Sequence, residues 1–404
     1  MRMWKDEKVK NAIMLGTLCS VIYLFVYFAR NVLSTVTPQI LEEGRFSTEH
    51  IGDLSSWFFA FYAVGQLING IIGDRVKARN LLSIGLLLAG TCNFLMPALM
   101  PWHLPATVVY GMSGYFLAMI YAPMTKVAAE NMEPLHAVRC TLGFTLASLL
   151  GSPLAGVAAA VFAWRVAFYL SGTVLLAMAV ACFVGFLWFE KRGIVTYGRY
   201  DRKEKESGSI RVLLERKIVK YTFISIVTGV IRTTVVFWIP TYMSQHLGFS
   251  AKVSAGIYTV STLAISAVVF LAAMIFEKLR QRMDQAMLVS FTISMVAFIL
   301  VYLVQQPVLN IICMGLAITA ANMSSTMMWS WYCPSLRDTG MVSTATGYLD
   351  FVSYMAAAVS SSLFAEAATT IGWSNLIMIW ALLMAFGTAI CARDGLRKQK
   401  EERV

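Results

Sequence analysis

Two arginines lie inside long apolar segments, at matching places in the two halves of this 404-residue chain. Arg30 belongs to the run VIYLFVYFARNVLSTVTP and Arg232 to the run FISIVTGVIRTTVVFWIP, half a chain length further on. A charge near the middle of a membrane-spanning helix costs about 2.5–3.5 kcal/mol, so a chain that keeps two of them needs a compensating partner. We therefore expect a membrane carrier that holds an anion between its two halves.

The composition supports a membrane protein with many spans. Hydrophobic residues make up 58% of the chain and charged residues only 14%, which is far more apolar material than a soluble core requires. The charged N-terminus runs directly into the first apolar segment without a small-residue cleavage site, so no removable signal peptide is expected. The seven cysteines form no CxxC or Cys/His cluster, which argues against a disulfide framework, a metal site or a cofactor.

Apolar segments long enough to cross a bilayer as helices recur along the whole chain. We predict twelve spans, at 11–38, 51–73, 80–99, 105–128, 138–162, 166–189, 218–243, 252–276, 285–304, 308–331, 342–366 and 374–392. With a cytoplasmic N-terminus, most of the 33 lysines and arginines fall in inner loops, and the outer loops hold only Arg45, Arg165 and Lys252. This bias predicts that both termini are cytoplasmic. It also explains the net charge of +11 by the membrane topology, so binding of nucleic acid is not expected.

One long polar segment, 190–217, divides the spans into six and six. Its mixed charges and its Gly and Ser residues are typical of a cytoplasmic linker, with a surface helix expected near 209–217. We therefore predict an N-terminal six-helix bundle at 1–189, this linker, and a C-terminal six-helix bundle at 218–404.

The loop after the second span, GIIGDRVKAR at 70–79, resembles the loop signature of the major facilitator superfamily. The resemblance implies an all-α membrane fold of twelve helices in two pseudo-symmetric bundles. It also implies a conformational latch made by Gly70, Asp74, Arg75 and Arg79. The GSPLAG stretch at 151–156 is loosely similar to a Gly/Pro-rich motif of some carriers, and close helix packing explains it equally well.

The surroundings of the two arginines resemble one family of that superfamily, the organophosphate:phosphate antiporters. The segments YFARNVLS and RTTVVFWIPTYMSQHLGFS are similar to the helices from which those carriers grip phosphate with one arginine each. The resemblance also implies substrate-binding roles for two tyrosines, Tyr23 and Tyr27. Because they precede Arg30 by seven and three positions, all three side chains share one helix face.

The chain departs from that family at three places. Gln66 stands where those antiporters carry a lysine, and Gly229 stands where a tyrosine is expected one turn before Arg232. The histidine that some of them use in the fifth span has no counterpart in TLASLLGSP. The two-arginine clamp therefore carries over, while the residues around it differ.

Two further charges inside the spans leave alternatives open. Lys126 in YAPMTKVAAE either pairs with Glu130, one turn below it, or points inward and replaces the charge missing at Gln66. Asp350 in TATGYLDFVSYM either balances Arg232 or Lys126, or serves as a proton site. Tyr354 lies one turn beyond Asp350 and is expected beside the substrate. Weaker candidates, which pack between helices in most proteins, are Tyr115, Met119, Tyr258, Asn322 and Trp329.

These observations predict a transporter of a small organic anion in the inner membrane, expected to be a monomer. The resemblance implies a phosphorylated metabolite, a sugar phosphate or glycerol phosphate, exchanged for inorganic phosphate. One alternative is a proton-coupled symporter of a sugar acid, although the Asp-Arg pair expected there is Ala29-Arg30 here. A second alternative is a membrane sensor of a phosphorylated sugar. An enzyme is not expected, because the chain contains no HExxH, GxSxG or Gly-rich phosphate loop in a suitable context.

Overall fold

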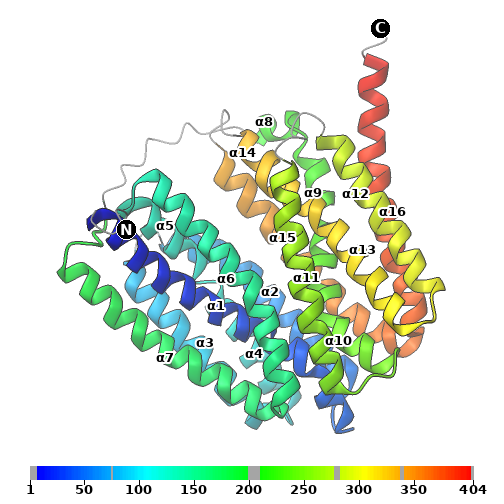
Figure 1. Cartoon of the computed structure of the whole chain (residues 1–404), viewed down its shortest axis with the longest axis horizontal. Coiled ribbons are helices and arrows are strands. Elements are labelled where there is room, and N and C mark those ends of the chain that lie inside the picture. The colour runs from blue at the N-terminus through cyan, green and yellow to red at the C-terminus, as the bar shows by residue number, and fades with distance from the viewer. Residues whose placement is uncertain (1–6, 74–75, 199–209, 277–282, 337–340, 402–404) are drawn as a thin grey trace. The chain divides into compact units, whose positions relative to one another are not determined.

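Each predicted span has a helical counterpart in the computed structural model, which describes residues 7–73, 76–198, 210–276, 283–336 and 341–401 (Figure 1). The elements in chain order are α1 (Glu7–Glu42), α2 (Thr48–Gly73), α3 (Ala78–Leu99), α4 (His103–Leu117), α5 (Tyr121–Asn131), α6 (Pro134–Val161), α7 (Trp164–Lys191), α8 (Ile210–Glu215), α9 (Ile218–Gly229), η1 (Val230–Val235), α10 (Val236–Gln245), α11 (Ala251–Phe276), α12 (Met283–Leu303), α13 (Pro307–Met327), η3 (Met328–Tyr332), α14 (Cys333–Ser335), α15 (Val342–Thr370) and α16 (Gly372–Glu401). Among the described residues, 11 helical segments are long and apolar enough to cross a membrane, and α2 supplies the remaining predicted span. The expected all-α membrane fold is therefore confirmed.

Three predicted spans are not single regular helices. The span at 105–128 breaks between α4 and α5, where the N–H groups of Met119 and Ile120 bond the carbonyls three residues back. Pro123, which follows, has no N–H to continue the regular ladder. The spans at 218–243 and 308–331 contain the π-helical turns η1 and η3, each shortly before a proline. Turns of this kind are frequent at functional sites, and η1 contains Arg232.

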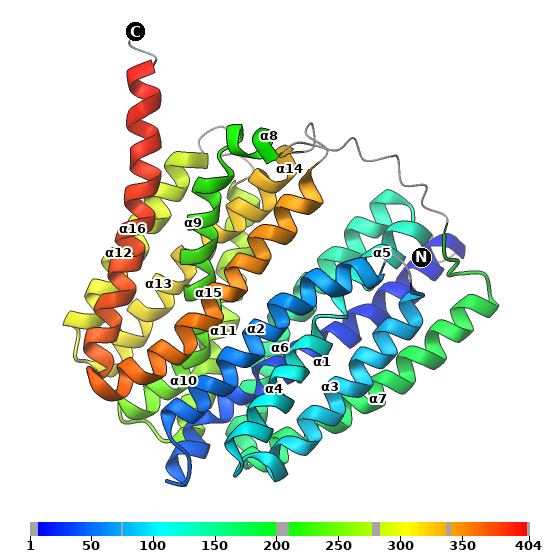
Figure 2. The ribbon, with the colours of Figure 1, turned by 180° about the vertical axis from the view of Figure 1, so that it is seen from behind.

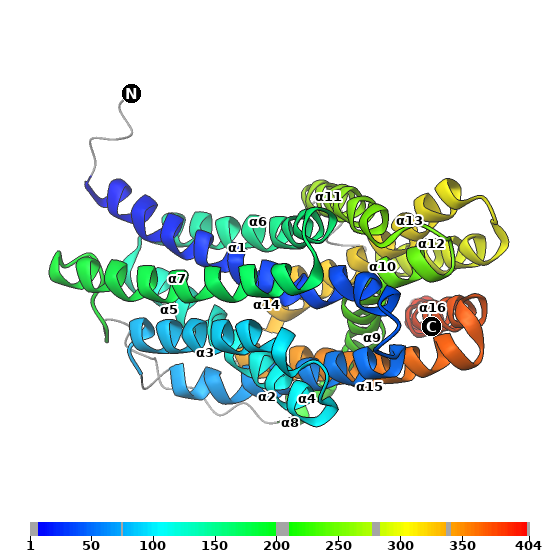
Figure 3. The same ribbon diagram turned by 90° about the horizontal axis from the view of Figure 1, so that it is seen from below.

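The chain forms two compact units, and each is described here by itself. Unit 1 comprises Met1–Lys203 and Phe249–Thr262, and unit 2 comprises Glu204–Gly248 and Leu263–Val404. In unit 1, α1 packs against α6 and α7, α3 packs against α7 and α4, and α2 packs against α4 (Figures 1 and 3). In unit 2, α12 packs against α13 and α16, and α9 with η1 packs against α15 (Figure 2).

Glycines allow the helices of unit 1 to approach closely. A Cβ atom on Gly151 of α6 would lie 2.9 Å from the backbone nitrogen of Phe28 and would also overlap the side chain of Tyr27. A Cβ atom on Gly114 of α4 would overlap the backbone of Phe58 in α2. Close packing thus accounts for the first glycine of the GSPLAG stretch, and it brings α6 directly behind the helix face that carries Arg30.

Gly151→Ala is expected to lower the free energy of unfolding by about 1–3 kcal/mol, because the new methyl group forces α6 away from α1. The measurement is thermal unfolding of the purified protein in detergent. Gly256→Ala in α11 is the matched control, because a Cβ atom there has open space, and its melting temperature should equal or exceed that of the parent. Equal melting temperatures for Gly151→Ala and the parent would contradict this packing.

Candidate functional site

Arg30 lies among tyrosine rings in unit 1. Its guanidinium carbon is 4.5 Å from the ring centroid of Tyr62 and 5.4 Å from that of Tyr27. The rings of Tyr27 and Tyr23 meet edge to face at 5.0 Å, as their spacing along one face of α1 requires. Two aromatic faces stabilise the cation at a depth where water is scarce, because each ring presents its negative face to the guanidinium. The structure thus brings together the three residues that the first arginine segment predicted.

Tyr62 of α2 is the member of this group that the sequence reasoning missed. It is 4% exposed, and it lies one helical turn before Gln66, which is half-buried on the same helix. A Cβ atom on Gly65 of α2 would lie 3.1 Å from the carbonyl oxygen of Tyr115, so this part of α2 packs closely against α4. The signal for Tyr62 was its spacing from Gln66, since positions four apart on a helix share a face.

Two more polar or aromatic side chains of unit 1 were also missed. Asn69 of α2 is fully buried and donates from Nδ2 to the carbonyl of Tyr115 at 3.3 Å. Tyr121 of α5 places its ring 5.5 Å from that of Tyr23. Neither residue carries charge, so neither stood out in the sequence. Asn69 lies one turn beyond Gln66 on α2, whereas only helix packing brings Tyr121 close to Tyr23.

Lys126 of α5 lies 4.0 Å from Glu130, on the next turn of the same helix. The lysine side chain is 34% exposed and the glutamate side chain is 5% exposed. The geometry matches the i, i+4 ion pair that the sequence offered as one of two interpretations of Lys126. Its distance of 4.0 Å is long for a charge-assisted hydrogen bond.

In unit 2, Arg232 lies on the π-helical turn η1 and faces α15. Its Nη2 atom is 4.0 Å from Oδ1 of Asp350, and its guanidinium carbon is 5.6 Å from the ring centroid of Tyr354. The side chains of Arg232 and Asp350 are 33% and 28% exposed. Asp350 and Tyr354 lie one turn apart on α15, so a single helix face provides both a carboxylate and an aromatic ring for this arginine.

Hydrogen bonds to the backbone of α15 hold the helix that carries Arg232. Ser225 of α9 donates to the carbonyl of Leu349 at 2.7 Å, and Thr234 of η1 donates to that of Ala357 at 3.0 Å. Between them, a Cβ atom on Gly229 would lie 2.8 Å from the carbonyl oxygen of Ser353. A tyrosine has no room at this position, which explains the departure from the family pattern at Gly229.

The remaining candidates have structural partners or lie among packed helices. Trp329 of η3 donates from its indole nitrogen to Ser325 at 3.2 Å, within the same helical segment. Tyr258 and Met119 are buried, at 0% and 8% exposure. Tyr115 contacts the neighbouring Phe116 ring at 5.8 Å. These contacts are the packing roles that the sequence offered as the commoner explanation.

The predicted latch falls partly outside the described residues, since Asp74 and Arg75 are not among them. Gly70 belongs to the last turns of α2. Arg79, at the start of α3, donates from Nη1 to Glu190 at 2.7 Å, and Tyr197 donates to the other oxygen of that carboxylate at 2.9 Å. Burial raises the pKa of the Tyr197 hydroxyl, so Tyr197 keeps its proton and remains a donor to Glu190.

The structure offers no metal or disulfide chemistry in the part of the chain that it describes. All seven cysteines are free, and no group of three His, Cys, Asp or Glu residues among the described positions is arranged to hold a metal ion. The groups near the two arginines supply charge and aromatic contact, which suits binding of an anion.

Comparison with known proteins agrees with this description of the helices. Residues 19–388 match the family model of the Major Facilitator Superfamily, and the chain therefore belongs to that superfamily. It is a multi-pass membrane transporter of that class.

Among curated proteins, the Membrane sensor protein UhpC of Escherichia coli is 37% identical over 73 residues, which are 18% of this chain and 17% of the sensor. The Glycerol-3-phosphate transporter of Haemophilus influenzae is 23% identical over 278 residues, covering 60% of this chain and 58% of the transporter. A Probable hexose phosphate transport protein of Chlamydia trachomatis is 21% identical over 161 residues, 39% of this chain and 35% of that protein. The chain thus spans less than two thirds of the length of these relatives. The resemblance to organophosphate carriers that the arginine segments predicted is confirmed.

Solved structures share the fold at low sequence identity. A bacterial homolog of the human lysosomal transporter Spinster, in an inward-facing conformation, aligns with a TM-score of 0.78 at 13% identity, over 94% of this chain and 96% of that one. The xylose transporter XylE from E. coli aligns with a TM-score of 0.70 at 14% identity, over 95% and 99% of the two chains. These matches confirm the major facilitator fold.

Gly229→Ala is expected to lower the melting temperature of the purified protein, at a cost of about 1–3 kcal/mol, because the methyl group meets the backbone of Ser353. Gly347→Ala on α15 is the matched control, since nothing lies near its built Cβ atom and its melting temperature should not fall. A melting temperature for Gly229→Ala as high as that of Gly347→Ala would show that α9 and α15 do not approach as described.

Proposed function

We propose that this protein is a secondary active transporter of a phosphorylated small metabolite, a sugar phosphate or glycerol phosphate, exchanged for inorganic phosphate. One observation carries the proposal: each unit holds an arginine inside an apolar helix against tyrosine rings, Arg30 in unit 1 and Arg232 in unit 2. Similarity to a glycerol-3-phosphate transporter and to a probable hexose phosphate transport protein supports the phosphate class.

In the proposed mechanism, one guanidinium from each half binds the phosphate group through paired charge-assisted hydrogen bonds. With no substrate bound, two like charges repel and are poorly solvated, which hinders closure around the site. A bound dianion neutralises both charges and lowers the barrier to alternating access. Exchange follows, because the empty carrier reorients slowly.

The neighbouring residues have distinct proposed roles. Tyr23 and Tyr27 orient Arg30 and line the substrate path, and Tyr62 holds its guanidinium from the opposite helix. Gln66 offers a neutral hydrogen-bonding group where related antiporters carry a lysine. Lys126 on α5 is the cation proposed to supply this missing charge.

The topology and the latch are also part of the proposal. We place both termini in the cytoplasm of a monomer in the inner membrane, with the bundles at 1–189 and 218–404 joined by the linker 190–217. The loop residues Gly70, Asp74, Arg75 and Arg79 would stabilise one conformation, with the Arg79–Glu190 ion pair anchoring the inner end of unit 1.

Asp350 supports a second candidate function, proton-coupled symport of a sugar acid or another carboxylate. Its carboxylate lies 4.0 Å from the guanidinium of Arg232, where gain or loss of a proton would change the charge beside the substrate. In this function Asp350 is protonated during the return of the empty carrier.

The 73-residue similarity to a membrane sensor supports a third candidate, sensing of a phosphorylated sugar without transport. A sensor and an antiporter would bind the ligand with the same two arginines. Substrate binding by the purified protein together with no counterflow in liposomes would favour the sensor.

Arg30→Lys and Arg232→Lys should each abolish phosphate counterflow in liposomes loaded with inorganic phosphate, because an ammonium group cannot form the two parallel bonds of a guanidinium. The loss of rate should reach about 100-fold, as expected for losing a charge-assisted pair. Arg211→Lys, at an exposed position of α8, is the control and should transport normally. Full uptake by the Arg232→Lys variant would refute the clamp.

Asp350→Asn separates antiport from proton symport. For phosphate exchange, the variant should keep counterflow and bind the anion more tightly, because the carboxylate beside Arg232 no longer competes. For proton symport, uptake driven by a pH gradient should disappear, while counterflow at equal pH persists. The measurement is uptake of glycerol-3-phosphate, hexose-6-phosphate and a sugar acid with and without an uncoupler.

A further inference from the structure

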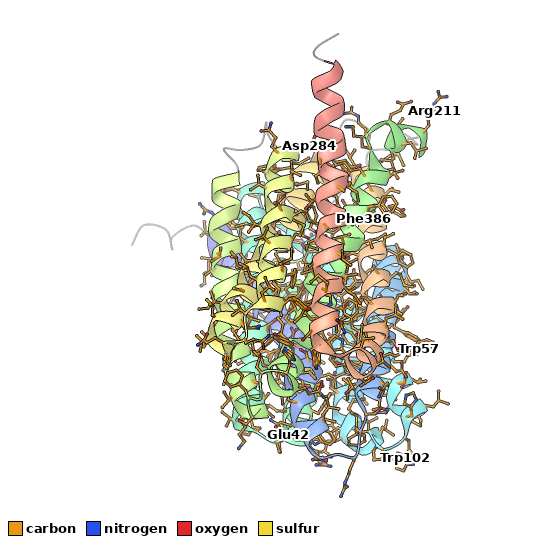
Figure 4. All side chains as sticks on the ribbon, turned by 90° about the vertical axis from the view of Figure 1, so that its right-hand side faces the viewer. Glu42, Trp57, Trp102, Arg211, Asp284 and Phe386 are labelled. Atoms are coloured by element: carbon orange, nitrogen blue, oxygen red, sulfur yellow. The ribbon has the colours of Figure 1, made fainter. Side chains whose placement is uncertain are left out.

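A cavity of about 450 Å³ lies at one end of unit 1, away from Arg30. Its polar lining is supplied by the loop between α1 and α2 and by the first turns of three helices, and includes Arg45, Ser47, His50, His103, Trp164 and Arg165. The volume falls within the range of about 300–1,000 Å³ typical of small-molecule sites. Glu42 and Trp102, labelled in Figure 4, mark this end of unit 1.

The lining of this cavity is basic, but burial lowers the pKa of His50, so this ring contributes a neutral N–H rather than a positive charge. The lining contains two arginines and two histidines, and no described Asp or Glu side chain lines the cavity. Arg165 donates twice to Glu43, at 2.7 and 3.1 Å, and these bonds hold the pKa of that carboxyl below its usual range. His103 lies 3.1 Å from Asp53. Arg45 is exposed on the cavity wall, and its positive charge also helps to lower the pKa of the Glu43 carboxyl.

Helix termini add to the positive potential. The cavity is lined by the first residues of α4 and α7, His103 and Trp164, and by Ser47, which precedes α2 and accepts from the N–H of His50 at 3.2 Å. The residues that precede α4 and α7, Trp102 and Ala163, make no side-chain capping bond. The first N–H groups of a helix have no partner within the helix, and they favour a negative charge nearby.

His50 gives an independent indication that a ligand belongs in this cavity. Its side chain is 9% exposed, and its Nε2 atom is buried without a hydrogen-bond partner among the described residues. The ring is held in place, stacked on Phe46 at 5.8 Å and against His103 at 4.8 Å. A buried polar atom left unsatisfied costs about 1–3 kcal/mol, and an acceptor inside the cavity would remove that cost.

We propose that this cavity is a second anion site, which binds a phosphate group through Arg45, His50 and the N-termini of α4 and α7. The occupant is a phosphate monoester or inorganic phosphate from solution, or the phosphate of a lipid headgroup at the membrane surface. The site lies near the C-terminal end of α1, and Arg30 lies about 18 Å back along that helix. It is therefore separate from the proposed arginine clamp.

Binding of radiolabelled inorganic phosphate to the full-length protein in phosphatidylcholine nanodiscs tests the site. In an Arg30→Ala/Arg232→Ala background, which removes the proposed clamp, saturable phosphate binding should remain. Adding Arg45→Gln or His50→Leu should weaken it by about tenfold or more, the effect of losing one charge-assisted hydrogen bond. Lys252→Gln is the matched control and should change nothing. It removes a positive charge at the same end of unit 1, where Ala251 bonds Glu42, but it does not line the cavity.

A second experiment, with added lipid, distinguishes the two sources of phosphate. If a headgroup occupies the site, phosphatidylglycerol added to the nanodiscs should displace phosphate, and its retention in native mass spectrometry should fall in Arg45→Gln. If only soluble phosphate binds, phosphatidylglycerol should leave binding unchanged. Both outcomes support the site.

Two results would overturn the proposal. One is phosphate binding that Arg45→Gln and His50→Leu leave unchanged. The other is the absence of both phosphate and phosphatidylglycerol binding from a clamp-free protein that elutes as a single folded species. If the His50→Leu variant does not fold, phosphate binding by the Arg45→Gln variant alone decides the question, because Arg45 is exposed. If the clamp-free protein does not fold, the number of phosphate sites in the parent should fall by one in Arg45→Gln.

Discussion

The rest of this structure depends on keeping two guanidinium groups charged inside an apolar bundle. A cation in such a place is costly, and the chain lowers the cost with aromatic faces: Tyr27 and Tyr62 for Arg30, and Tyr354 for Arg232. Asp350 lies 4.0 Å from the guanidinium of Arg232. A contact with an aromatic face does not use the hydrogen-bond donors of a guanidinium, whereas a tight ion pair does. This arrangement suits a group that must bind and release an anion.

Holding these side chains in place requires unusually close helices. Gly151 lets α6 reach the backbone of Phe28, and Gly229 lets α9 reach that of Ser353, so each arginine-bearing helix is seated against a neighbour without an intervening side chain. Hydrogen bonds from Ser225 and Thr234 to α15 then fix the rotation of the second helix. In a bilayer such contacts replace the hydrophobic driving force, because lipid tails are as apolar as the side chains themselves.

The helix pattern was predictable because hydropathy and loop charge are local properties of the chain. All twelve spans were expected, and each has a helix within a few residues. The interruptions were not expected: the break before Pro123 and the π turns at Arg232 and Trp329 depend on backbone hydrogen bonding rather than on composition. Likewise, Tyr23, Tyr27 and Arg30 could be grouped by their spacing on one helix. The contacts of Tyr62 with Arg30 and of Tyr121 with Tyr23 could not, because contacts between helices have no local signature, although Tyr62 and Asn69 share a face of α2 with Gln66.

By itself, the sequence determined a membrane transporter of the major facilitator class with one arginine inside an apolar span in each half, because span length, loop charge and a short loop motif encode these features directly. Tertiary structure decided which groups surround each charge. It placed Asp350 4.0 Å from the guanidinium of Arg232, and it showed that a side chain at Gly229 would meet the backbone of Ser353. It also gathered Arg45, His50 and the first turns of α4 and α7 around one cavity, although these residues are far apart in the chain. Such neighbours are set by helix packing, which depends on the shapes of whole helix faces and not on any short stretch of residues.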